Sequence, residues 1–188
     1  LEEADIVGNV DSESLQYDTI QATNISGGFF LRKDLIGLES IQAEIKPAKL
    51  MVSGTVPLEE GKDLDLDLSV NTFEPAAFAA LYPHLRDFGG RIDLKLKVGG
   101  TLKSPLLTGN VDWLNPSFQK FKMKRIFGKV TGDSELQVID VSDISLTSLS
   151  GKTHKLLGFV SVKDELSADF KVKFENQEIP EFLEPFGF

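Results

Sequence analysis

The segment Ile92-Asp93-Leu94-Lys95-Leu96-Lys97-Val98 places an aliphatic side chain at every second position and a charged side chain between each pair. Successive side chains of a β-strand point to opposite faces. The segment therefore predicts a strand with one apolar face and one charged face. A shift by one residue would turn the lysines onto the apolar side, so the pattern also fixes which side must be covered.

The same period of two recurs along the whole chain. Residues 64–70 alternate leucine or valine with aspartate or serine, and residues 166–174 alternate apolar with polar side chains. Shorter segments of the same kind cover residues 41–45, 52–58, 107–113, 144–146 and 156–162. Turn residues such as those at 59–62 and 99–105 separate the segments, as in antiparallel meanders. The long inserts that parallel crossovers need are absent, so we expect an all-β antiparallel sheet.

The sequence also contains an internal repeat with two copies. Gly8-Asn9-Val10-Asp11 returns 101 residues later as Gly109-Asn110-Val111-Asp112, and further on the offset grows to about 104, where Gly54 matches Gly158. We therefore expect one repeat-built domain over residues 1–188, with two copies of about 100 residues at about 1–88 and 100–188. Because the pattern is already under way at both ends, we expect the chain to be a fragment of a longer repeating protein.

Short helices are expected at the end of each copy. Residues 74–82, Glu-Pro-Ala-Ala-Phe-Ala-Ala-Leu-Tyr, place a proline in the first turn and strong helix formers after it, and Pro83 ends the segment. Residues 178–185 repeat the device, which predicts a second short helix at Pro180–Leu183. We expect both helices to cap an end of the sheet.

Composition excludes several classes of function. The net charge of −9 argues against binding to a nucleic-acid backbone. The chain has no cysteine, which excludes disulfides, a thiol nucleophile and thiolate metal sites. The chain contains no run of about 18 apolar residues, so the sequence predicts no membrane-spanning helix.

The motifs that would indicate catalysis or metal binding are incomplete. Gly151-Lys152-Thr153 lacks the earlier glycine of a phosphate loop and predicts a hairpin turn instead. Asp63, Asp65 and Asp67 alternate with leucines, which indicates the solvated face of a strand rather than a calcium loop. His84 and His154 lie near turns, and we expect both at the surface. We expect neither an enzyme nor a cofactor or metal site.

The apolar face of such a sheet must be covered by something. A sandwich would supply a second sheet, a barrel would close the sheet on itself, and a trough would fold it along its long axis. The repeat favours a trough or sandwich over a sealed barrel, and a trough would hold a lipid chain or an apolar peptide. The residues expected to line this groove are Leu64, Leu66, Leu68, Val70, Ile92, Leu94, Leu96, Val98, Val111, Trp113, Ile144, Leu146, Val160, Val162, Phe170, Val172 and Phe174.

Residues 98–111, Val-Gly-Gly-Thr-Leu-Lys-Ser-Pro-Leu-Leu-Thr-Gly-Asn-Val, resemble the recurring signature of the TamB family. In that family an alternating strand leads into Val-x-Gly-Thr-Leu, followed by proline, an apolar residue, any residue, glycine and another strand. Gly90-Arg91-Ile92-Asp93 resembles the family's strand start, and Leu157-Gly158-Phe159-Val160 its closing half. The first copy departs from the pattern, because Lys46-Pro47-Ala48-Lys49 stands where the second copy has residues 151–154.

The resemblance implies a β-taco, a sheet curved into an apolar-lined trough. It implies a parent protein anchored in the inner membrane of a Gram-negative cell, with this chain in its periplasmic region. The parent would work with TamA, an outer-membrane barrel insertase. It would bind the acyl chains of phospholipids and pass these lipids between the membranes. It would also support outer-membrane protein assembly and contact nascent outer-membrane proteins.

Two other functions fit the same pattern. A chaperone-like module would bind β-strands of outer-membrane proteins through exposed sheet edges. A structural spacer or adhesin-like repeat would bury its apolar face completely and bind nothing.

Overall fold

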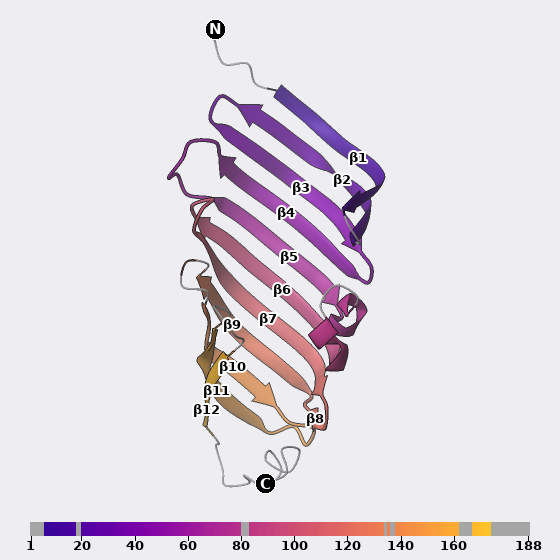
Figure 1. Ribbon diagram of the computed structural model, residues 1–188, viewed down its shortest axis with the longest axis vertical. Coiled ribbons are helices and arrows are strands. Elements are labelled where there is room, and N and C mark those ends of the chain that lie inside the picture. Colours follow the sequence, from indigo (N-terminus) through magenta and orange to yellow (C-terminus); the bar gives the residue numbers. More distant parts are fainter. Residues whose placement is uncertain are drawn as a thin grey trace.

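The computed structural model describes residues 6–17, 20–79, 83–133, 135, 138–161 and 167–173. Its strands form one 12-stranded antiparallel sheet in which almost every strand pairs with the next along the chain (Figure 1). The prediction of an all-β antiparallel fold is confirmed. All described strands belong to this sheet, so the sandwich alternative does not apply to the described part of the chain.

The strands other than the short β8 have 7 to 14 residues each. The strands are β1 (Ile6–Tyr17), β2 (Ile20–Arg32), β3 (Leu35–Ile45), β4 (Ala48–Pro57), β5 (Asp65–Phe73), β6 (Phe88–Gly100), β7 (Pro105–Phe118), β8 (Phe121–Lys122), β9 (Arg125–Asp133), β10 (Val138–Thr147), β11 (Thr153–Ser161) and β12 (Ser167–Lys173). The short strand β8 pairs with β7 only, and β7 also pairs with β9.

Hairpin turns join the strands where the sequence predicts them. At 148–152, between β10 and β11, the Ser148 N–H donates to the Lys152 carbonyl at 2.8 Å, and the Gly151 N–H donates to the Ser148 carbonyl at 3.0 Å. The hairpin expected at Gly151-Lys152-Thr153 is confirmed.

Strand pairing separates the side chains onto two faces. Leu66 pairs with Val98, Leu68 with Leu96 and Val70 with Leu94 across β5 and β6. Directly opposite residues of an antiparallel pair share a face. We call this side the apolar face. The other side, which carries Asp65, Asp67, Lys95 and Lys97, is the charged face.

The registers of the first strands return in the last ones. Pairs 101 residues apart correspond in β1/β2 and β7/β9, and pairs 103 to 104 residues apart correspond in later strands. Examples are Gly8–Phe29 with Gly109–Val130, Val10–Gly27 with Val111–Gly128, Ile41–Val52 with Ile144–Leu156, and Gly54–Leu66 with Gly158–Phe170. The two copies expected at about 1–88 and 100–188 can be compared only over these strands, because residues 174–188 lie outside the described residues.

Glycine permits close approach between strands at Gly54 and Gly109, two of the glycines that match between the copies. Gly54 has φ +120°, and a Cβ built there would lie 2.0 Å from the Asp65 carbonyl oxygen. A Cβ on Gly109 would lie 2.0 Å from the Lys95 carbonyl oxygen. Both contacts are with backbone atoms of the neighbouring strand, which cannot rotate away. Glycine at these positions therefore lets the sheet bend where any larger residue would collide.

The helix expected over residues 74–82 is wrong. Two 3₁₀-helices occur instead, η1 (Pro75–Phe78) and η2 (Pro83–Asp87), beside the ends of β5 and β6 in Figure 1. Two prolines within nine residues leave little length for α-helical hydrogen bonds, and the Glu74 side chain makes no capping bond. Residues 80–82, and the second helix expected at Pro180–Leu183, lie outside the described residues.

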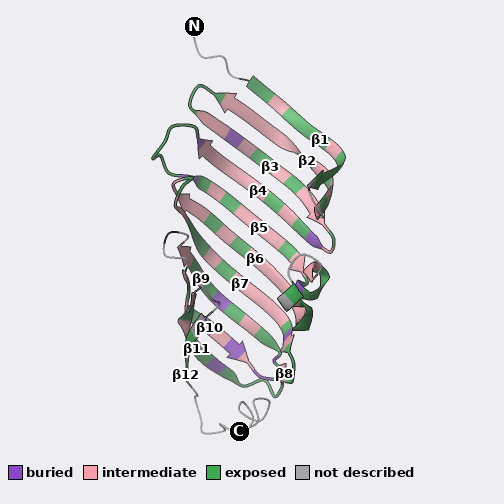
Figure 2. Cartoon of the chain, viewed as in Figure 1, coloured by how far each residue is buried: buried purple, intermediate pink, exposed green. Residues whose placement is uncertain are grey.

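Fully buried side chains are few in the described part of the chain. Figure 2 shows intermediate exposure along most of the strands, with isolated buried positions. Met123, Ile144 and Leu146 form a cluster of buried apolar residues, packed against half-buried neighbours of β7 to β11. The apolar face is thus best covered towards β9–β11, and the trough itself stays a prediction.

Candidate functional site

The apolar face is organised as rows that run across the strands. In one row, each residue stands directly opposite the next on successive strands: Leu50, Val70, Leu94, Val111, Gly128, Ile144 and Leu156. A second row contains Phe73, Ile92, Trp113, Ile126, Leu146 and His154. Two further rows pass through Leu66–Val98 and Leu68–Leu96. The alternating apolar residues therefore form a continuous surface, because the strand registers place the apolar positions of neighbouring strands opposite one another.

Most of the predicted groove residues lie in these rows. Leu64 precedes β5 instead; it is 7% exposed, and its N–H donates to the Gly100 carbonyl at 2.6 Å. Val162 and Phe174 lie outside the described residues, as do the side chains of Val160, Phe170 and Val172. The pairing of Gly158 with Phe170 is nevertheless defined for the backbone.

The surface extends beyond the predicted set. On β2 to β4, Phe29, Leu38 and Gly54 stand in one row, and Leu31, Ile36 and Val56 in another. Alternation in β2 and β3 is interrupted by residues with positive φ, Asn24 at 53° and Ser40 at 51°, where the registers shift. At each shift one strand carries one extra residue, and beyond it apolar residues again stand opposite apolar residues. Regular alternation could not show which residues of β2 and β3 lie on the apolar face. The glycine and aliphatic residues that match between the two copies indicate them.

An aromatic cluster lies where the apolar face meets η1 and η2. The rings of Phe73 and Phe78 are 4.8 Å apart, and Phe88 lies 4.5 Å from Phe118 and 6.2 Å from Trp113 between centroids. The Trp113 Nε1–H donates to the Gly89 carbonyl at 3.0 Å, so the one polar atom of this ring is satisfied. Of this cluster, only Trp113 was predicted to line the groove.

His154 is a correction to the expectation of surface histidines. It is 6% exposed and stands opposite Leu146 at the end of the second row. The turn at 148–152 precedes His154, but strand β11 begins at Thr153. The alternation of side chains along β11 places position 154 on the apolar face. The side chain of His84 lies outside the described residues.

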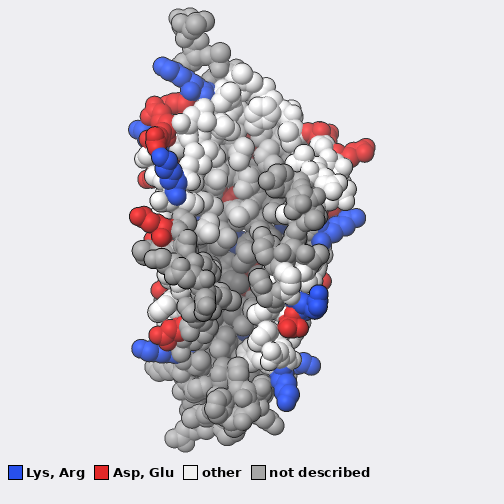
Figure 3. Space-filling model, viewed as in Figure 1, with Lys and Arg blue, Asp and Glu red and all other residues white. Residues whose placement is uncertain are grey.

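Apolar side chains on this face are mostly half-buried rather than covered. Leu66, Leu68, Val70, Leu94 and Leu96 all have intermediate exposure. In the upper part of Figure 3 uncharged atoms cover the middle of the visible face, and charged side chains project along its two sides. Such a continuous apolar surface is larger than isolated exposed aliphatic residues would produce.

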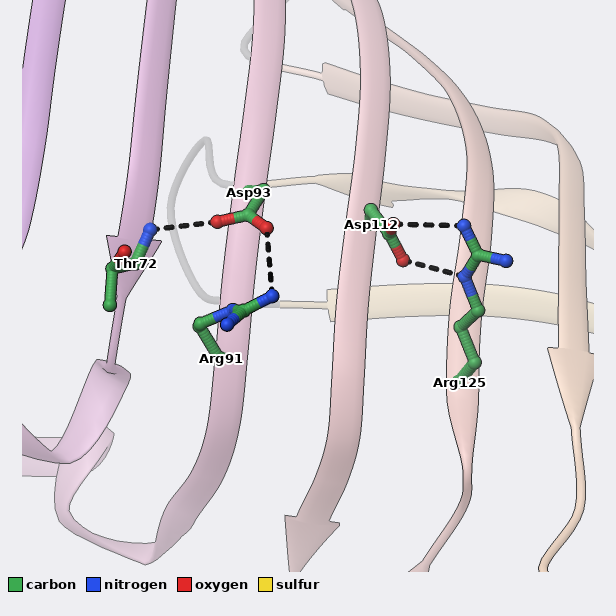
Figure 4. A network of polar contacts seen from close by, with 5 residues as sticks. All are labelled: Thr72, Arg91, Asp93, Asp112 and Arg125. Carbon is green, nitrogen blue, oxygen red and sulfur yellow. Dashed lines mark hydrogen bonds and ion pairs between the residues drawn. The ribbon is translucent and has the colours of Figure 1, made fainter.

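Ion pairs occupy the charged face. Lys97 Nζ lies 3.1 Å from Asp65 Oδ1, and Arg125 donates to both carboxylate oxygens of Asp112 at 2.7 and 2.8 Å (Figure 4). Hydrogen bonding to Asp65, and then the negative charges of Asp65 and Asp67, raise the pKa of Lys97 above its ordinary 10.5. The hydrogen bond to Asp112 likewise raises the pKa of Arg125. Asp65 and Asp67 are exposed, as expected for a solvated strand face.

The described residues hold no group of three or more histidine, aspartate or glutamate side chains placed to bind a metal ion. None of their helices is long and apolar enough to cross a membrane. Comparisons with protein-family models, with curated proteins and with solved structures found no match.

Proposed function

We propose that this chain is a hydrophobic-groove module that carries the acyl chains of phospholipids along its apolar face. One observation supports this most strongly: rows of aliphatic side chains continue across the sheet while remaining half-buried, and the charges gather on the opposite face. A spacer would have no reason to leave such a surface partly open. The row structure suits an extended apolar ligand better than a compact one.

The apolar surface can provide enough free energy for capture. Each buried methylene contributes about 0.8 kcal/mol, so an acyl chain of about 16 carbons offers about 13 kcal/mol before ordering costs. The rows repeat the same chemistry from strand to strand, so no position differs much in affinity from the next. Transfer along such a surface needs no single tight site.

The resemblance to the TamB family extends the proposal to the parent protein. There this chain would form part of a periplasmic groove between the inner and outer membranes, acting with TamA in phospholipid transport and outer-membrane protein assembly. The motif at residues 98–111 supports this, and so does the meander that places it at the turn between β6 and β7.

The decisive experiment combines lipid detection with a charge on the proposed floor. Native mass spectrometry of the purified chain should reveal copurified phospholipid, and a photocrosslinker on the apolar face should label acyl chains. Leu96→Arg should abolish both signals while the fold survives, because a charge on an open face can reach water. Gln42→Arg is the matched control, since Gln42 is exposed and pairs with Ser26 and Met51 on the charged face.

Other outcomes identify the competing functions. Absence of lipid from the parent chain, together with strong destabilisation by Leu96→Arg, would indicate a closed spacer, because an isolated charge in a dry core costs several kcal/mol. Competition by unfolded outer-membrane protein segments, without lipid crosslinking, would indicate a chaperone-like module.

A further inference from the structure

Strand β1 forms one edge of the sheet. Among the described residues it pairs with β2 alone. Its apolar residues are open to solvent, with Val7 75% and Ile6 53% exposed. An exposed strand edge presents backbone N–H and C=O groups that can accept another strand.

Strand β7 shows what the same sequence does when both of its sides are paired. It repeats the Gly-Asn-Val-Asp of β1, and its register with β9 reproduces that of β1 with β2. On its other side β7 pairs with β6, where Leu96 stands opposite Gly109 and Lys95 opposite Asn110. The β6 strand is therefore an internal template for a partner of β1.

We propose that the free edge of β1 binds an extended, antiparallel strand with the chemistry of β6, alternating aliphatic and basic residues. Transferring the β6–β7 register places a leucine opposite Gly8 and a lysine opposite Asn9. At Gly109 a Cβ would meet the Lys95 carbonyl oxygen of β6 at 2.0 Å, whereas at Gly8 it would meet the Phe29 ring of β2 at 2.7 Å, so the transferred feature is the register and not this contact.

Charge favours the same partner. Strand β1 contains Asp11 and Glu13 and no basic residue, whereas β6 contains Arg91, Lys95 and Lys97 against a single acid, Asp93. Opposite charges on facing strands stabilise pairing, and like charges oppose it. In a second folded copy of this chain β6 is paired on both sides by β5 and β7, so that strand is not available to β1.

The test uses the intact chain and a fluorescent peptide with the sequence of residues 88–100. Fluorescence anisotropy measures binding, and hydrogen exchange locates it. We expect saturable binding and slower exchange in β1. A peptide of identical composition, with the aliphatic and charged residues grouped in separate blocks, should bind far more weakly, because it cannot present one apolar and one charged side.

Substitutions at Asn9 test the register. This residue is exposed at the edge, so its replacement should leave the fold intact. Asn9→Lys should weaken peptide binding about twofold to fivefold, and Asn9→Glu should strengthen it by a similar factor. A peptide carrying Lys95→Glu should reverse this order.

Several results would overturn the inference. The block peptide could bind as tightly as the alternating one, or peptide binding could slow hydrogen exchange in β12 alone. The affinity could be independent of the charge at position 9, or exchange in β1 could slow without peptide as the protein concentration rises. The last result would mean that a second copy occupies the edge. The inference rests on pairing registers and stands whether or not the chain carries lipid.

Discussion

Asp93 and Asp112 stand directly opposite each other across β6 and β7, two carboxylates in one cross-strand pair on the charged face. Each is compensated by its own partners. Asp93 accepts a hydrogen bond from the Thr72 N–H at 2.7 Å and lies 3.4 Å from Arg91 Nη2, while Arg125 holds Asp112 through two bonds (Figure 4). Thr72 has φ +61° and sits at a register shift of β5, so Asp93 also holds this bulge in place.

Removing the arginine should therefore expose the repulsion between the carboxylates. We expect Arg125→Gln to lower the free energy of unfolding by about 1 kcal/mol, since this pair is partly exposed. Adding Asp112→Asn in the same chain should restore most of the loss. Urea denaturation of both single variants and the double variant measures the coupling; strictly additive effects would contradict it.

Close approach at Gly54 should make it far less tolerant than another glycine with positive φ. Gly54→Ala should destabilise the fold by roughly 3 kcal/mol, because the methyl group collides with backbone as well as straining φ. Gly61 has φ +79° with open space around it, so Gly61→Ala should cost only about 1 kcal/mol. Thermal denaturation of the two variants compares them, and equal losses would remove the argument for close approach.

Cysteine labelling can separate the two faces cleanly, because the chain contains no cysteine of its own. A maleimide should react faster with the Asp67→Cys variant than with Leu66→Cys, since position 67 faces water and position 66 is half-buried. Added phospholipid or detergent should slow the reaction at position 66 and leave position 67 unchanged. The opposite order of rates would mean that the faces are assigned the wrong way round.

The raised pKa of Lys97 should be visible in an NMR titration of its side chain. Its bond to Asp65 favours the charged form, so the stabilisation is present below the ordinary pKa of 10.5 and is lost as the pH rises through the higher folded value. Asp65→Asn should return the pKa towards 10.5. Asp67→Asn should lower it less, because Asp67 acts by its charge alone; a larger effect of Asp67→Asn would reverse the order of causes.

Alternation predicted the strands and their facing wherever it was unbroken. Within residues 66–70 and 92–98 the parity of each side chain follows from the sequence, because a period of two and a buried side leave one register. Thr72 and Ser40 could not be placed in this way. Each adopts a positive φ that residues with a Cβ seldom take, and only partners on neighbouring strands, such as Asp93, make the bulge stable.

The positions that sequence reasoning missed depend on contacts between distant residues. His154 is buried because β11 has begun and Leu146 stands opposite, neither of which its neighbours in sequence reveal. The Phe88, Trp113 and Phe118 cluster joins residues of two strands after a register shift at Gly90. Helix propensity over residues 74–82 was overridden in turn, because Pro75 and Pro83 are each compatible with short 3₁₀ turns.

The strand order has a mechanical consequence. Strands β1 and β12 lie at opposite ends of the sheet, and the strands between them are paired almost in chain order (Figure 1). Tension drawn from β1 to β12 therefore pulls across the strands and loads the hydrogen bonds of one hairpin at a time. We expect the sheet to yield by unzipping, one hairpin after another, and therefore to extend in steps under tension.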